Sequence, residues 1–114
     1  MANLQTLFDL QKKLQLLHGH DFDKMTIDEK ETYTRDAILY LSEETHELLR
    51  EINFKTYKKT KKPVNIQNVR EEVADIQHFI INIAICWGMN ADDLIAAFLA
   101  KNEKNVQRVS DQTY

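Results

Sequence analysis

The spacing of apolar and polar residues along the chain predicts four helices. Leucines recur at helical intervals between residues 2 and 17, which makes one side of this first segment apolar. Three further segments show the same periodicity, at about residues 26–57, 66–87 and 91–108. Only two glycines and one proline occur, which argues against a turn-rich β fold. We therefore expect an all-α fold, a bundle of four to five helices.

The predicted helix ends carry residues that favour them. Thr26, followed three positions later by a glutamate, has the form of a capping box, and Asn65 and Asn90 precede the third and fourth helices as N-caps. A lysine cluster followed by Pro63 is expected to end the second helix, because proline cannot continue it.

The third predicted helix is apolar around nearly its whole circumference. Residues 80, 81, 83, 84 and 85 are all isoleucine or alanine. Such a helix must be buried on all sides, which four helices of this size achieve poorly alone. A homodimer that shares the bundle is therefore predicted. We expect the single cysteine, Cys86, and the neighbouring Trp87 in the core.

Four carboxylates interrupt the apolar stripes of the second and third helices. Glu44 and Glu47 lie three positions apart on one helix, and Glu72 and Asp75 do so on the other. Glu44 and Glu72 occupy positions where the pattern requires apolar side chains, and a buried carboxylate is costly without a partner. Four hard oxygen ligands on facing helices predict a Mg²⁺ site, and the alternative is a solvated acidic rim.

A di-iron centre is a second interpretation of the acidic residues. Glu43-x-x-His46 and Asp75-x-x-His78 have the Glu-x-x-His form that such bundles use. That design also needs an inward glutamate on each of the other two helices. The first predicted helix has none and the fourth has only Glu103, so the Mg²⁺ site is preferred.

Composition and charge narrow the function classes. The 114 residues fit a single domain, residues 1–114, and the formal net charge of -3 gives no broad basic surface for nucleic acid. The two glycines lie too far apart for a P-loop. No leader is evident and the apolar run at residues 76–87 is too short to span a bilayer, so we expect a cytoplasmic protein without membrane contact.

Several motifs occur in a fixed order along nearly the whole chain. They are Leu7-Phe-Asp-Leu-Gln-Lys-Lys-Leu14, the two carboxylate pairs, Phe54-Lys-Thr-Tyr-Lys58, Asp75-Ile-Gln-His-Phe79 and Leu99-Ala-Lys-Asn-Glu-Lys-Asn-Val-Gln-Arg108. In this order they resemble the all-α nucleoside triphosphate pyrophosphohydrolases, most closely the dimeric dUTPases, including short phage and bacterial forms. The last segment resembles that family's K-N-x-x-N-x-x-R phosphate-binding tail. In longer members the tail continues as R-Q-x-x-G-Y, whereas here a threonine precedes Tyr114.

The resemblance implies a Mg²⁺-dependent homodimer that hydrolyses dUTP to dUMP and pyrophosphate, with dUDP as a candidate second substrate. It implies two or more Mg²⁺ ions, with Mn²⁺ as a possible substitute, bound by Glu44, Glu47, Glu72 and Asp75. Glu47, with Glu44, would orient a water and accept its proton. The expected substrate-binding residues are Gln11, Lys55, Lys58, Asn82, Lys101, Asn105, Arg108 and Tyr114.

Two other functions stay open from the sequence. Related MazG-like enzymes share the carboxylate motif and hydrolyse a broader set of nucleotides. A helical homodimer that only binds a ligand is the alternative from another class, and the complete carboxylate quartet argues against it.

Overall fold

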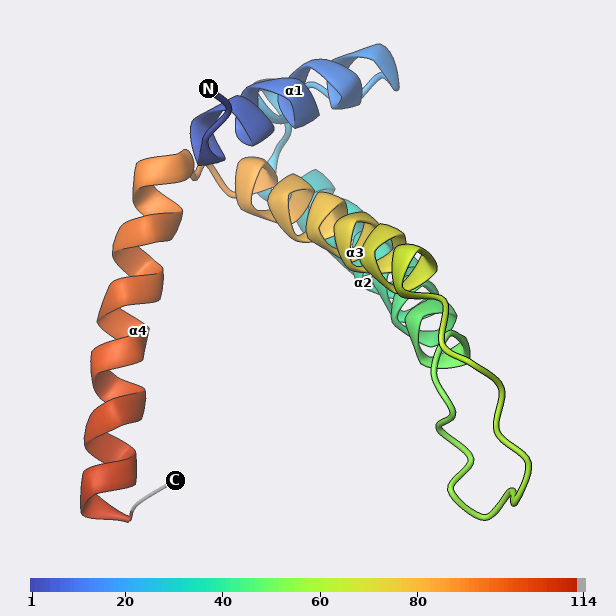
Figure 1. Ribbon diagram of the computed structural model, residues 1–114. Helices are drawn as coiled ribbons and strands as arrows, with labels where there is room; N and C mark the ends of the chain where they lie inside the picture. The colour runs from blue at the N-terminus through green and yellow to red at the C-terminus, as the bar shows by residue number, and fades with distance from the viewer. Residues whose placement is uncertain (113–114) are drawn as a thin grey trace.

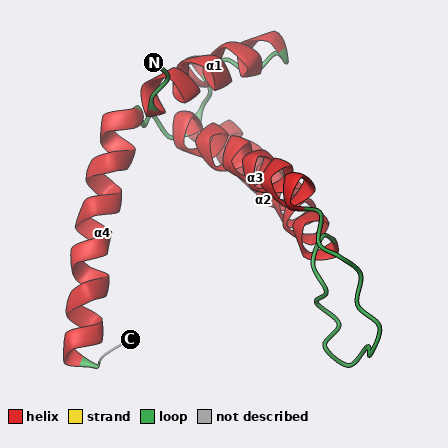
Figure 2. Ribbon diagram, in the orientation of Figure 1, coloured by secondary structure: helices red, strands yellow, loops and turns green. Residues whose placement is uncertain are grey.

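The computed structural model describes residues 1–112 and is all-α, as the sequence predicts (Figures 1 and 2). No strand occurs within those residues. The elements are α1 (Leu4–Leu17), the short 3-10 helix η1 (Phe22–Lys24), α2 (Ile27–Arg50), α3 (Ile66–Cys86) and α4 (Ala91–Asp111).

Local side-chain bonds begin the helices, and they confirm the predicted caps. Thr26 and Glu29 form a reciprocal capping box at the start of α2. Asn90 forms a second one with Asp93 at α4, and the Asn65 side chain accepts a bond from the backbone at the start of α3. These caps therefore satisfy some of the free N–H groups of each helix start from within three positions, and at α4 the Ala91 N–H also donates to Gln5 Oε1 of α1 at 3.3 Å.

The predicted end of the second helix, at about residue 57, is wrong. Helix α2 ends at Arg50, and residues 51–65 form a loop. The Asn53 side chain explains this difference, because its Nδ2 donates to the Lys62 carbonyl at 2.9 Å and its Oδ1 accepts from the Lys62 N–H at 3.1 Å. Asparagine bonds of this kind compete with helix formation.

Helices α2 and α3 lie side by side, α1 crosses the end of α3, and α4 runs away from this group (Figure 1). The change of direction follows Gly88, whose φ of 79° lies in the left-handed region that favours glycine. Helix α4 then leaves α3 at 103°. A small core lies where α1, η1, α3 and the start of α4 meet, and it consists of Phe8, Phe22, Ile81, Ala84, Ile85, Cys86 and Ala91.

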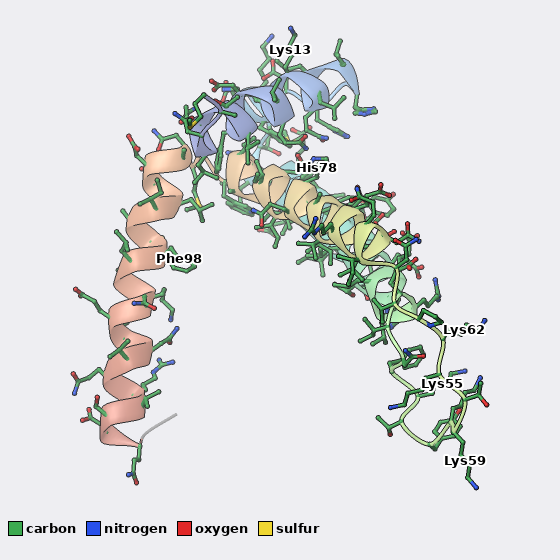
Figure 3. The ribbon with its side chains drawn as sticks, in the orientation of Figure 1. Lys13, Lys55, Lys59, Lys62, His78 and Phe98 are labelled. Atoms are coloured by element: carbon green, nitrogen blue, oxygen red, sulfur yellow. The ribbon has the colours of Figure 1, made fainter. Side chains whose placement is uncertain are left out.

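Much apolar surface is left uncovered in the single chain. The leucine stripe of α1 is largely exposed, and Leu17 retains 78% of its surface. Trp87, predicted in the core, is 42% exposed, and its indole N–H donates to the Thr34 hydroxyl. Phe98 projects from α4 into open space (Figure 3) and is 69% exposed. Cys86 is fully buried, as predicted.

Among the described residues, no single helix combines the length and apolarity needed to cross a membrane. Helices α3 and α4 meet the criterion only when they are taken together across their bend.

Candidate metal centre and nucleotide pocket

Three of the four predicted metal ligands converge between α2 and α3. Glu44 on α2 and Glu72 and Asp75 on α3 each offer a carboxylate oxygen, and these oxygens lie within 4.8 Å of one another. Side-by-side packing of the two helices brings the three residues together, and all three are half-buried. The fourth predicted ligand, Glu47, is exposed. Its charge raises the pKa of both Glu44 and Glu72, which places it at the edge of this acidic cluster.

The acidic cluster has no counter-charge within residues 1–112. The ion pairs of this region do not involve its carboxylates, and the Oε2 atoms of Glu44 and Glu72 are buried without a hydrogen-bond partner. Burial raises the pKa of both glutamates above the ordinary value, and the charges of Glu47 and Asp75 raise it further. Buried, unpartnered oxygens of this kind fit a hard divalent cation such as Mg²⁺.

A pocket of about 590 Å³ adjoins the acidic cluster. Glu44 and Asp75 form part of its wall, and helices α1, α2 and α3 all contribute to it. Its volume lies within the range of small-molecule sites, and its lining combines aromatic rings with many amide, imidazole and carboxylate side chains. The acidic cluster therefore opens into a space that can hold a nucleotide.

Gln11 and Asn82, predicted to contact the base, both line this pocket. They are 7% and 5% exposed, and Gln11 Nε2 donates to Asn82 Oδ1 at 2.7 Å. Each amide carries both a donor and an acceptor. This bond leaves Gln11 Oε1 as an acceptor and Asn82 Nδ2 as a donor, neither of which takes part in it.

The predicted phosphate-binding lysines Lys55 and Lys58 lie in the loop of residues 51–65. Figure 3 labels Lys55 in this loop, beyond the paired ends of α2 and α3. Both line a second pocket of about 360 Å³ together with other basic residues of the loop. The loop directly connects the helix that carries Glu44 to the helix that carries Glu72. Neither lysine lines the pocket beside the acidic cluster.

The remaining predicted contacts lie on α4 or beyond it. Lys101, Asn105 and Arg108 are exposed on α4, which extends away from α2 and α3 within the single chain (Figure 1). One chain therefore does not bring these residues to the acidic cluster. Tyr114 lies outside the described residues.

Sequence reasoning missed several residues of the pocket wall. Gln15, Tyr33 and Tyr40 all line it, and so does His20. Gln11 and Gln15 are four positions apart and so share one face of α1. The exposed leucine stripe of α1 dominated the periodicity and concealed this polar face, although a pair of glutamines at helical spacing was the available signal.

Comparison with known families gave one match. The family described as dUTPase matches residues 3–89, which include the three converging carboxylates and the amide pair. The chain therefore belongs to this dUTPase family, and the relationship to the dimeric, all-α dUTPases is confirmed. Comparisons with curated proteins and with solved structures found no match. The match ends before α4, so the residues of α4 take no support from it.

Proposed function

We propose that this protein is a Mg²⁺-dependent dUTP pyrophosphohydrolase. Family membership supports hydrolysis of dUTP in general. The observation that carries the proposal is that Glu44 and Asp75 border the same pocket as Gln11 and Asn82. A triphosphate at the acidic end of this pocket would leave its base facing the amides.

Glu44, Glu72 and Asp75 would hold Mg²⁺, with Glu47 at the edge of the site. When bound, Mg²⁺ offsets the charge of the phosphates and lowers the pKa of water. A carboxylate oxygen of Glu47 would orient the attacking water and accept its proton. Water adds across the bond between the α- and β-phosphates, which gives dUMP and pyrophosphate. Gln11 Oε1 and Asn82 Nδ2 would accept from and donate to the uracil edge.

A test of this proposal measures pyrophosphate release with Mg²⁺ from dUTP, dTTP, dCTP and the purine nucleotides, and phosphate release from dUDP. We expect selective hydrolysis of dUTP, with or without dUDP. Glu72→Ala should remove turnover while the helical circular dichroism signal stays. Glu71→Ala is the matched control, because Glu71 is the exposed neighbour that bonds to Gln67 instead. Hydrolysis of several bases would instead favour a MazG-like enzyme, and retained turnover in Glu72→Ala would exclude the proposed site.

The active unit in this proposal is a homodimer in which α4 of one chain reaches the site of the other. The exposed apolar residues of α1 and α4 support it, since exposed apolar surface of this extent is typical of an interface. Lys101, Asn105 and Arg108 would then bind phosphate in the partner's site, as Lys55 and Lys58 would from the loop.

A mixing experiment tests the contribution of α4. Glu72→Ala and Arg108→Ala should each be inactive alone, because one lacks a metal ligand and the other a phosphate contact. When the two variants are mixed and exchange subunits, half of the dimers are hybrids. In each hybrid one of the two sites combines an intact Glu72 from one chain with an intact Arg108 from the other. About a quarter of wild-type turnover should therefore return. No recovery in verified hybrids would show that α4 does not act on the partner's site.

A further inference from the structure

Helix α1 presents a third buried amide to the pocket, and the proposed contacts leave it without a role. Gln15 is 8% exposed, and Gln11, Gln15 and Asn82 are the buried polar side chains of the described chain. All three line the pocket beside the acidic cluster. Burying an amide is unfavourable unless its hydrogen-bonding groups are used. Three amides in one wall therefore indicate a surface that recognises a polar ligand edge.

Tyr33 on α2 fixes the orientation of the Gln15 amide. Its hydroxyl donates to Gln15 Oε1 at 3.0 Å. The Tyr33 ring is itself held by edge-to-face contacts with Phe22, at 4.8 Å between centroids, and with His20, at 5.1 Å. Burial raises the pKa of Tyr33 to about 12, with a smaller contribution from the neighbouring Cys86, so the hydroxyl keeps its proton at any physiological pH.

This bond leaves the other end of the Gln15 amide available. Because Oε1 accepts from Tyr33, the Nε2 group is the end that can contact a ligand, and it makes no hydrogen bond within residues 1–112. An N–H donor complements a carbonyl oxygen and opposes an amino group. Uracil and cytosine differ at position 4, where uracil carries O4 and cytosine carries an amino group, and at N3, which donates in uracil and accepts in cytosine. A donor such as Gln15 Nε2 distinguishes the two bases at position 4.

We propose that Gln15 is a specificity-determining residue that donates a hydrogen bond to the O4 carbonyl of a uracil base. Tyr33 is a positioning residue that holds Gln15 in this orientation. The inference rests on the proposed function in that it places a base in this pocket. It adds a reason why the site would reject cytosine nucleotides, which have the same size. The Gln15 N–H would face the amino group of cytosine, and both donors would then be left without an acceptor.

Three variants test the two roles separately. Gln15→Met keeps the length of the side chain and removes its donor. Gln15→Glu replaces the donor by an acceptor, since Tyr33 would still donate to one oxygen and the other would face the base. Tyr33→Phe keeps the ring and its packing and releases the amide. Gln77→Met, an exposed glutamine on α3 outside this pocket, is the matched control.

The measurement is the ratio of the dissociation constants of dCMP and dUMP by calorimetry, beside the ratio of kcat/KM for dUTP and dCTP. Losing one neutral hydrogen bond corresponds to a roughly 3- to 10-fold fall in preference for uracil, which we expect for Gln15→Met and Tyr33→Phe. Gln15→Glu should shift the ratio furthest, toward cytosine, and Gln77→Met should leave it unchanged. A merely structural role would weaken both nucleotides alike.

The outcomes separate this inference from the proposed function. If folded Gln15 and Tyr33 variants, verified by circular dichroism, keep the wild-type ratios, the inference is overturned even though dUTP hydrolysis stands. If wild-type protein hydrolyses no nucleotide, the proposed function fails, and the dUMP and dCMP binding ratio still decides the role of Gln15. A wild-type preference for dUMP that Gln15→Glu shifts toward dCMP supports the inference, whereas equal binding of both overturns it.

Discussion

The buried bond between Gln11 and Asn82 leads to a quantitative prediction about stability. Replacing only one partner, by Gln11→Met or Asn82→Leu, leaves the other amide with an unpaired polar atom. Such a loss costs about 1–3 kcal/mol, and the lower part of that range applies here, because both residues border a pocket that water can enter. We therefore expect each single variant to lose about 1–2 kcal/mol of unfolding free energy.

The double variant should behave differently from the sum of its parts. Replacing both amides by apolar groups of similar shape removes both partners together, so the cost should stay below about 1 kcal/mol. The expected coupling between Gln11 and Asn82 is then at least about 1 kcal/mol. If the proposed base contacts hold, the double variant should also hydrolyse dUTP less selectively, because it presents neither the donor nor the acceptor to the base.

Urea unfolding, followed by circular dichroism at one fixed protein concentration, measures these differences, since the stability of a dimer depends on concentration. Gln77→Met serves as the control and should lie within about 0.5 kcal/mol of the wild type, because Gln77 is exposed. If the double variant costs as much as the two single variants added together, the bond between the amides does not couple them and the reasoning is refuted.

Two further predictions concern the acidic cluster and the core. The pKa values of Glu44 and Glu72 are raised above 4.5 in the folded protein, so both residues bind protons more tightly when the protein is folded. This stabilises the metal-free fold at pH values below 4.5. The stabilisation is lost, and the melting temperature should fall, as the pH rises through the raised pKa values. Mg²⁺ should therefore stabilise more at higher pH, and an equal shift at pH 5 and pH 8 would contradict this. Ile81→Ala should lower the free energy of unfolding in urea by about 2–5 kcal/mol, because Ile81 is 1% exposed. A loss below about 1 kcal/mol would show that the core is loosely packed.

The features that depend on short stretches of sequence were predictable. The caps at Thr26, Asn65 and Asn90 act over three positions, so a sequence pattern contains all the information that they need. The convergence of Glu44 with Glu72 was also predictable, because each interrupts an apolar stripe and two such stripes face each other in a bundle.

Features that depend on distant residues were not predictable in the same way. The early end of α2 depends on a bond between Asn53 and Lys62, which lie nine positions apart. The polar face of α1 was hidden because its leucines dominate the pattern, although those leucines are exposed in a single chain. The direction of α4 depends on the turn at Gly88, and a helix-periodic pattern does not encode such an angle.

The bond between Gln11 and Asn82 also bears on the order in which the protein folds. It joins residues 71 positions apart, whereas the caps that begin the helices are local. Closing so long a segment is entropically costly, so the pocket is complete only after the first and third helices have met. A nucleotide held between these helices would fasten the N-terminal segment to the rest of the chain. Bound substrate would thus reduce local unfolding and proteolysis of α1. The same contacts that bind the base would therefore also stabilise the folded protein.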